Sequence, residues 1–178
     1  MKKVICTFAG TVVIFALAFI AYIYSGSYNI SQLSHHNKLT LWIIAKTTHH
    51  SINKRLKDIV VPSLSDSSMI ATGLVHYNEM CVICHGAPGI DPGEIVEGLY
   101  PRPPKFYKSN DMPDPDEAFW IIKYGIKLTS MPAFAPTHTD DKIWAITAFL
   151  LNKMNIMPPE EYKDRTGEYS GSETGQEE

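Results

Sequence analysis

The chain has 178 residues, of which 44% are hydrophobic and 20% are charged, and its formal net charge is −3. This length suits one globular domain with additional segments, and the slightly negative charge excludes a protein that binds nucleic acid through a strongly basic surface. The charge is unevenly distributed, because residues 35–57 carry basic residues and no acid, whereas residues 160–178 are rich in acids. We expect both segments to be solvated.

An uncharged run of apolar or small residues covers residues 4–24, directly after Lys2 and Lys3. A helix of this length crosses a bilayer, which needs about 20 residues. A cleaved secretory signal is the alternative, because residues 16–18 have the small-x-small form of a cleavage site. Cleavage there would leave a strongly apolar new N-terminus, so we favour an uncleaved transmembrane anchor over residues 1–24. The lysines place the N-terminus inside and the rest of the chain outside that membrane.

Residues 25–64 are expected to form a linker that contains a basic amphipathic helix. Mostly apolar residues recur every three or four positions between Trp42 and Ile59, which is helix spacing, and Pro62 ends the pattern. The basic side of this helix suits anionic lipid. A packed or linking helix is the favoured interpretation.

Three further helices are predicted within residues 65–159. The first runs from about Asp66, a good N-cap, to Met80. It contains Gly73, and a glycine inside a helix lowers its stability, which suggests that another backbone comes close there. Prolines are frequent in residues 86–113, which predicts a loop.

The next helix has Asp114 as its cap, a proline in its first turn, Glu117 as the partner in a capping box and Gly125 at its end. The last helix begins near Thr139, and the proline pair at residues 158–159 ends it.

The tail over residues 160–178 lacks apolar content and is predicted to be disordered. Three short helices make a small core for so much predicted loop. This imbalance suggests that a group other than protein fills the middle of the domain.

Residues 81–85 read Cys-Val-Ile-Cys-His, and C-x-x-C-H is the attachment signature of a c-type haem. The spacing lets Cys81 and Cys84 each add to one vinyl group of the porphyrin, and His85 then projects under the ring as the proximal iron ligand. A zinc site would need two more good ligands, and a redox dithiol would be expected in a βαβ unit. A simple disulfide is the remaining alternative. The single motif predicts one covalent haem c.

Met131 is the expected second axial ligand of the iron. It lies in a predicted loop between two helices and is followed by Pro132. Its thioether would favour ferrous iron and raise the reduction potential. Met112 and His138 are the alternatives, and ligation by His138 would lower the potential.

The order of these motifs resembles the monohaem class I cytochromes c, in their membrane-anchored bacterial form, over about residues 65–157. The resemblance implies an all-α class I cytochrome c fold, with three to four short helices around a covalently bound haem, behind an N-terminal transmembrane helix. The haem domain is then residues 65–159. It faces the periplasm from a single-pass anchor in the bacterial inner membrane.

In that family a glycine and an aromatic residue on the first helix of the domain cross the last helix. Gly73 and Tyr77 match these positions, with Ile146 and Phe149 as their expected partners. A loop proline also orients the proximal histidine in the family, and either proline of the pair at residues 103–104 matches it.

These features predict an electron carrier and not an enzyme, because iron with two protein ligands has no open site for substrate. The expected partners are membrane lipid, through the N-terminal helix, and redox proteins of a respiratory chain. These would be a quinol-oxidising complex, a dehydrogenase, or a terminal oxidase or reductase. The alternative is a fixed cytochrome subunit of a membrane-bound dehydrogenase or oxidoreductase complex. A haem peroxidase or a gas sensor would need a vacant sixth position.

Four lysines in the loops and helices after the motif are candidates for steering an acidic partner. Acidic residues are interleaved with them, so a mixed surface is an equal expectation. The four are Lys105, Lys108, Lys123 and Lys127.

Overall fold

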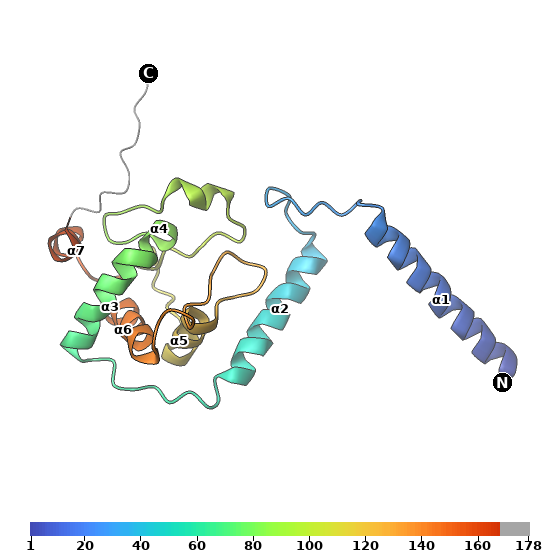
Figure 1. Ribbon diagram of the computed structural model, residues 1–178, viewed down its shortest axis with the longest axis horizontal. Helices are drawn as coiled ribbons and strands as arrows, with labels where there is room; N and C mark the ends of the chain where they lie inside the picture. The colour runs from blue at the N-terminus through green and yellow to red at the C-terminus, as the bar shows by residue number, and fades with distance from the viewer. Residues whose placement is uncertain (168–178) are drawn as a thin grey trace, which may run out of the picture. The chain divides into compact units, whose positions relative to one another are not determined.

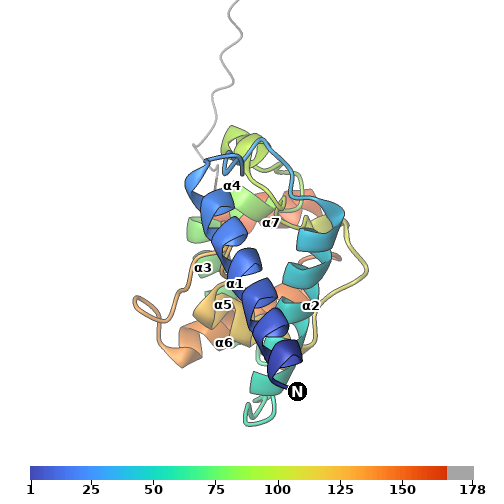
Figure 2. The same ribbon diagram turned by 90° about the vertical axis from the view of Figure 1, so that its right-hand side faces the viewer.

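The computed structural model describes residues 1–167 and divides into two compact units, residues 1–35 and residues 36 onward (Figures 1 and 2). Within the described residues every regular element is a helix, and no β-strand occurs. The all-α class predicted from the sequence is therefore confirmed.

The first unit contains one long helix, α1 (Lys2–Tyr24). The helix agrees with the apolar run predicted over residues 4–24, and none of its residues is buried within the structure. It is long and apolar enough to cross a membrane, a criterion that an N-terminal secretory signal also meets.

The second unit contains the remaining helices, joined by extended segments and two short 3-10 turns. In chain order they are α2 (Lys38–Arg55), α3 (Ser67–Met80), α4 (Val82–His85), η1 (Glu94–Gly98), η2 (Phe106–Lys108), α5 (Pro115–Tyr124), α6 (Asp140–Asn152) and α7 (Pro159–Thr166).

Helices α3 and α6 cross in close contact, and this crossing organises the second unit (Figure 1). Gly73 on α3 is buried against the backbone of α6, where a Cβ built on the glycine would lie 1.8 Å from the carbonyl oxygen of Ala145. One turn further along α3, the ring of Tyr77 packs on Phe149 with centroids 5.5 Å apart. The crossing expected from Gly73 and Tyr77 is therefore present.

Helix α6 is enclosed by other elements along most of its length. All eight residues from Ile143 to Leu150 are buried, in agreement with a sequence that is apolar on every side there. The single polar side chain among them, Thr147, donates its hydroxyl to the carbonyl of Ile143 at 2.9 Å. Trp144 stacks on Phe119 of α5 with ring centroids 4.0 Å apart. Helix α6 therefore connects α3 to α5 through one core.

Most of the predicted helix boundaries in the haem domain are reproduced. The prediction that the proline pair at residues 158–159 ends the last helix is wrong, because α6 ends at Asn152 and Pro159 begins α7. The capping of α5 also differs from the prediction. Asp66 caps α3 by accepting a hydrogen bond from the backbone of Met69 at 2.8 Å, and α5 ends at Gly125. Asp114 occupies the N-cap position of α5, but its side chain makes no capping hydrogen bond. The carboxylate of Asp116 instead accepts from the backbone of Glu117 at 2.9 Å, so the predicted capping box does not form.

Helix α2 belongs to the second unit and packs on α5. It ends at Arg55, earlier than the periodic pattern that continues to Ile59. Ile52 is buried with 4% of its surface exposed, whereas Trp42 is 60% exposed. The predicted apolar stripe is therefore wrong at Trp42, which faces solvent in the described structure.

The predicted disordered tail is wrong for its first residues. Residues 159–166 form α7, and Tyr162 within it is completely buried. The phenol of Tyr162 donates to the side-chain oxygen of Asn78 on α3 at 3.0 Å. One buried aromatic residue thus docks a segment that is otherwise polar. Residues 168–178 of the predicted tail lie outside the described residues.

Replacing Gly73 with alanine should lower the free energy of unfolding of the second unit by about 1–3 kcal/mol, the usual effect of overpacking a core. The reason is the collision of the new Cβ with the backbone of Ala145. Urea unfolding followed by circular dichroism measures the loss. Gly98→Ala is the control, since an added Cβ there meets no heavy atom within 4 Å. Equal stabilities of the two variants would contradict the close crossing.

Candidate haem site

The C-x-x-C-H segment forms a tight helical turn at the end of α3. Cys81 ends α3 and begins α4, and its carbonyl accepts backbone hydrogen bonds from Cys84 at 3.1 Å and from His85 at 2.8 Å. Residues three apart on a helix are neighbours on its surface. Both thiols are free and partly buried, so the turn presents two sulfur atoms on one side, as attachment to two points of a single ring requires.

The protonation of the thiols does not suit a redox dithiol. Burial, and secondarily the neighbouring Cys84, raise the pKa of Cys81 to about 12. Burial also raises the pKa of Cys84. Reactive dithiols have lowered pKa values. Within residues 1–167, no three His, Cys, Asp or Glu side chains are grouped closely enough to hold a metal ion, so this part of the chain does not supply the further ligands that zinc would need.

His85 is held in one orientation by the loop that follows. Its Nδ1 lies 2.9 Å from the carbonyl oxygen of Pro104. A carbonyl only accepts, so Nδ1 carries the hydrogen. Burial lowers the pKa of His85, and the bond to Pro104 opposes this shift only in part. The imidazole is therefore neutral, with the lone pair of Nε2 free to bind iron. The structure selects Pro104 from the predicted pair at residues 103–104.

The backbone after His85 is fixed from two sides. The buried phenol of Tyr77 donates to the carbonyl of Gly86 at 2.9 Å. Gly86 has a φ of +68°, and a Cβ there would lie 2.7 Å from the ring of Tyr107 and 2.8 Å from the carbonyl oxygen of Ile90. The positive φ and the lack of space for a Cβ both require glycine at this position. Helix α3 thereby holds the same turn that carries the two cysteines.

An ionic cluster around Asp91 connects the loop directly after His85 to residues 105–108. One carboxylate oxygen of Asp91 accepts from the phenol of Tyr107 at 2.8 Å and from Lys105 at 3.3 Å, and lies 3.4 Å from Lys108. The hydrogen bond from Tyr107 is the largest cause of the lowered pKa of Asp91. The cluster is not predicted from the sequence, because its members lie 14 to 17 residues apart.

The lysines proposed for steering are mostly paired within the domain. Lys105 and Lys108 face Asp91, and Lys123 lies 2.7 Å from Asp140. These pairs favour the mixed-surface alternative over a free basic patch.

Met131 lies in a segment that is hydrogen-bonded to the C-terminal end of α5. The carbonyl of Met131 accepts from the backbone of Ile126 at 3.2 Å, and its amide donates to the hydroxyl of Thr129 at 3.1 Å. The amide of Phe134 donates to the carbonyl of Ile122 at 3.2 Å. Gly125 has a φ of +66°, and a Cβ on it would lie 2.7 Å from the carbonyl oxygen of Met131. The backbone of Met131 is therefore fixed by short-range contacts.

The two methionine candidates both border the main core. The side chains of Met112 and Met131 are partly buried and pack against the same core cluster as Cys81. The network around Gly125 and Thr129 distinguishes Met131, because it holds this residue in a defined place.

His138 lies in a separate cluster of rings against α3. Its ring meets His76 at 5.6 Å and Phe134 at 5.5 Å between centroids, and its Nδ1 is 2.8 Å from the hydroxyl of Thr137. Burial is the largest cause of the lowered pKa of His138, followed by the charges of His76 and Lys142. The contacts of this ring account for its position without an iron.

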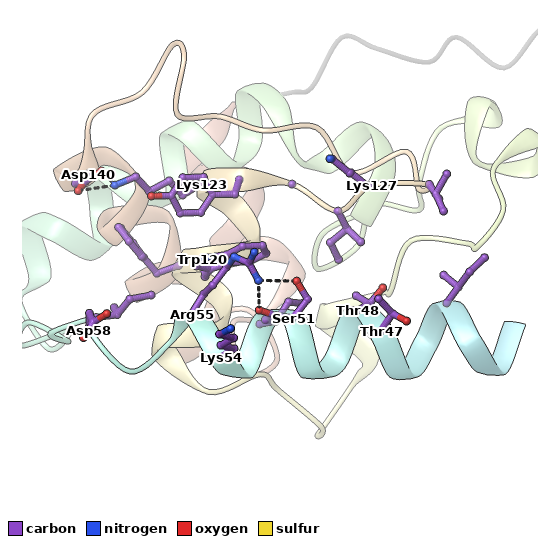
Figure 3. A pocket seen from close by; sticks show the side chains of 18 of the residues that line it. Thr47, Thr48, Ser51, Lys54, Arg55, Asp58, Trp120, Lys123, Lys127 and Asp140 are labelled. Carbon is purple, nitrogen blue, oxygen red and sulfur yellow. Dashed lines mark hydrogen bonds and ion pairs between the residues drawn. The ribbon is translucent and has the colours of Figure 1, made fainter.

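A groove of about 1210 Å³ lies between α2 and α5 (Figure 3). Thr48, Ser51 and Arg55 line it from α2, and Trp120 and Lys123 line it from α5. Cys81, Cys84, His85 and Met131 are not among its lining residues. The groove therefore belongs to the junction of α2 with the domain and is distinct from the candidate haem site.

Residues 68–150, slightly less than half of the chain, match the family model described as "Cytochrome C oxidase, cbb3-type, subunit III". The comparisons found no significant match among curated proteins or solved structures. The matched region contains the C-x-x-C-H turn, Pro104, Gly125 and Met131. The chain thus contains a class I c-type cytochrome domain. Such a domain binds haem c covalently and transfers electrons.

Gly125→Ala should lower the stability of the domain by about 1–3 kcal/mol more than Gly167→Ala, the usual effect of overpacking. Both glycines have a positive φ, but only Gly125 faces another backbone, whereas an added Cβ at Gly167 meets open space. The difference between the two urea-unfolding free energies measures the close contact of Gly125 with the backbone of residues 131–133. A difference near zero would contradict this contact.

Proposed function

We propose that the chain is a membrane-anchored electron carrier with one haem, held covalently by Cys81 and Cys84, with His85 and Met131 as the axial iron ligands. The observation that carries the proposal is the neutral imidazole of His85 beside the two thiols, with Nδ1 bonded to Pro104 and Nε2 left free. When bound, haem supplies an iron that gains and loses one electron.

The protein residues keep the ligands in place. The Pro104 carbonyl fixes the ring plane and tautomer of His85, and such a bond to a ligating histidine raises its basicity. The ring of Phe106 stacks on the imidazole of His85, with the ring centroids 5.1 Å apart. On the Met131 side, the bonds of Met131 to Ile126 and Thr129, and those of the following residues 134–135 to α5, limit movement of the backbone. With two protein ligands the iron has no free coordination position, which the binding of a small molecule would need. The arrangement therefore suits electron transfer.

The second candidate function is a fixed cytochrome subunit of a membrane-bound oxidoreductase complex. The description of the matching family, which names a subunit of a cbb3-type oxidase, favours it. Extraction in mild detergent distinguishes the two: a carrier is purified alone, and a subunit is purified with the rest of its complex. The redox partners of either form are the quinol-oxidising complexes, dehydrogenases, and terminal oxidases or reductases of a respiratory chain.

We further propose that α1 is an uncleaved single-pass anchor in the bacterial inner membrane, with the cytochrome domain in the periplasm. The apolar length of α1 and the preceding Lys2 and Lys3 support this topology. The full-length protein should remain in the membrane fraction after a salt wash, and its C-terminal domain should be digested by protease added to the periplasmic side. A mature N-terminus at Phe19 would instead show that the segment is a cleaved signal.

The C-x-x-C-H turn predicts that haem remains with the polypeptide after denaturation and acid–organic extraction. The double variant Cys81→Ala and Cys84→Ala should lose this covalent haem and fold poorly, because the ring is expected to form much of the core. Absorbance of the extracted and the protein-bound fractions measures the distribution. Haem that is extractable from the wild-type protein would contradict covalent attachment.

Ligation by Met131 predicts a weak near-infrared band from methionine-to-iron charge transfer in the oxidised protein. Met131→Ala should remove the band, lower the reduction potential, and allow carbon monoxide to bind ferrous iron, because it removes a soft neutral ligand. Met112→Ala and His138→Ala are the controls and should leave all three properties unchanged. Ready binding of carbon monoxide by the wild-type ferrous protein would instead support an enzyme or a gas sensor.

A further inference from the structure

Helix α2 has an outer face whose residues do not line the groove. It consists of residues spaced by three or four positions, all of them exposed, and α2 lies at the edge of the second unit (Figure 1). At its N-terminal end Leu39 is 66% exposed and Trp42 is 60% exposed. The members of this outer face are Leu39, Trp42, Lys46, His50 and Asn53 of α2, together with the exposed Lys57, which lies two residues beyond the end of the helix at Arg55.

The residues on and around the outer face carry a net positive charge, and Asp58 is the first carboxylate that follows them. Residues 35–57 include no acidic residue. Within the described part of the chain, no ion pair is recorded for Lys46 or Lys57. By contrast, Lys105, Lys108 and Lys123 all face carboxylates. Helix α2 therefore carries basic residues and no acidic one, and Lys46 and Lys57 make no ion pair within the described residues.

The chain itself limits how far α2 can lie from a membrane. The candidate span ends at Tyr24 and α2 begins at Lys38. The intervening segment of 13 residues reaches about 45 Å at most when fully extended. This step rests on the proposed function of α1 as an anchor.

We propose that the outer face of α2 binds the anionic phospholipid surface of the bilayer in which α1 is anchored. Leu39 and Trp42 enter the interfacial layer, where tryptophan is favoured because its ring is apolar and its N–H is polar. Lys46 and Lys57 lie along the phosphates of the headgroups. A cationic face with apolar and tryptophan side chains at one end is the pattern of helices that lie in the membrane interface.

The basic residues of this face and the short segment that joins α2 to α1 favour lipid over an acidic protein as the partner. The apolar side chains of the outer face, Leu39 and Trp42, lie at the end of α2 that follows the linker, which suits insertion at a surface. Binding of α2 to the bilayer would hold the cytochrome domain near membrane-bound redox partners. It would also set the orientation of the domain, because α2 is packed on α5.

The proposal is tested with the full-length haem-containing protein reconstituted into vesicles of phosphatidylcholine, with and without phosphatidylglycerol. Flotation of the protein with the vesicles reports the anchor, and hydrogen–deuterium exchange of peptides from residues 38–57 reports α2. Exchange in α2 should be several-fold slower in the vesicles that contain phosphatidylglycerol. High salt should reduce this difference, because it screens the lysines.

Two pairs of variants separate a specific face from general attraction. Lys46→Gln with Lys57→Gln should abolish the lipid dependence, whereas Lys127→Gln with Lys142→Gln, which changes the net charge equally, should preserve it. Leu39→Ser with Trp42→Ser should weaken the protection, and Val60→Ser with Ile156→Ser, at two other exposed apolar positions, should not.

The outcomes distinguish the anchor from the outer face. Failure to float with either lipid would overturn the anchoring by α1 and this proposal together. Flotation with equal α2 exchange in both lipids, or equal effects of the two lysine pairs, would overturn the lipid-binding face alone. Protection that appears only after membrane proteins are added would assign the face to a protein partner and also overturn the proposal.

Discussion

The close crossing of α3 and α6 is the constraint on which the rest of the domain depends. At Gly73 the backbones approach so closely that a single added carbon would overlap Ala145. This contact fixes the direction of α3, and the C-x-x-C-H turn continues directly from its end. The crossing also encloses α6, whose other side packs on α5. One backbone contact thereby relates the segment that carries the cysteines to the helix that leads to Met131.

The candidate haem site is built mainly from backbone groups. Pro104 supplies a carbonyl to His85, and α5 supplies carbonyls and a glycine to the segment of Met131. These backbone hydrogen bonds hold the ring of His85 and the backbone of Met131 in defined positions. The paired lysines on the surface fit a carrier whose partner recognition does not depend on one large basic patch.

Helix α2 lies outside the residues that the cytochrome family model matches. Its inner side packs through Ile52, while its outer face exposes Trp42 and unpaired lysines. If this face rests on lipid, the linker and α2 together restrict the domain to one orientation near the membrane. Electron transfer between two anchored proteins then depends on diffusion in the plane of the bilayer.

The sequence alone determined the features that depend on neighbouring residues: the apolar run of α1, the C-x-x-C-H turn, the glycine and proline limits of α5, and the glycine of the helix crossing. Only the tertiary structure decided which proline faces His85, how Asp91 pairs, and that Tyr162 docks α7 against a residue 84 positions earlier. It also showed that Trp42 is exposed although it follows helical spacing. The physical reason is that spacing and capping act within a few residues, whereas hydrogen bonds and burial between distant segments exist only once the chain has folded.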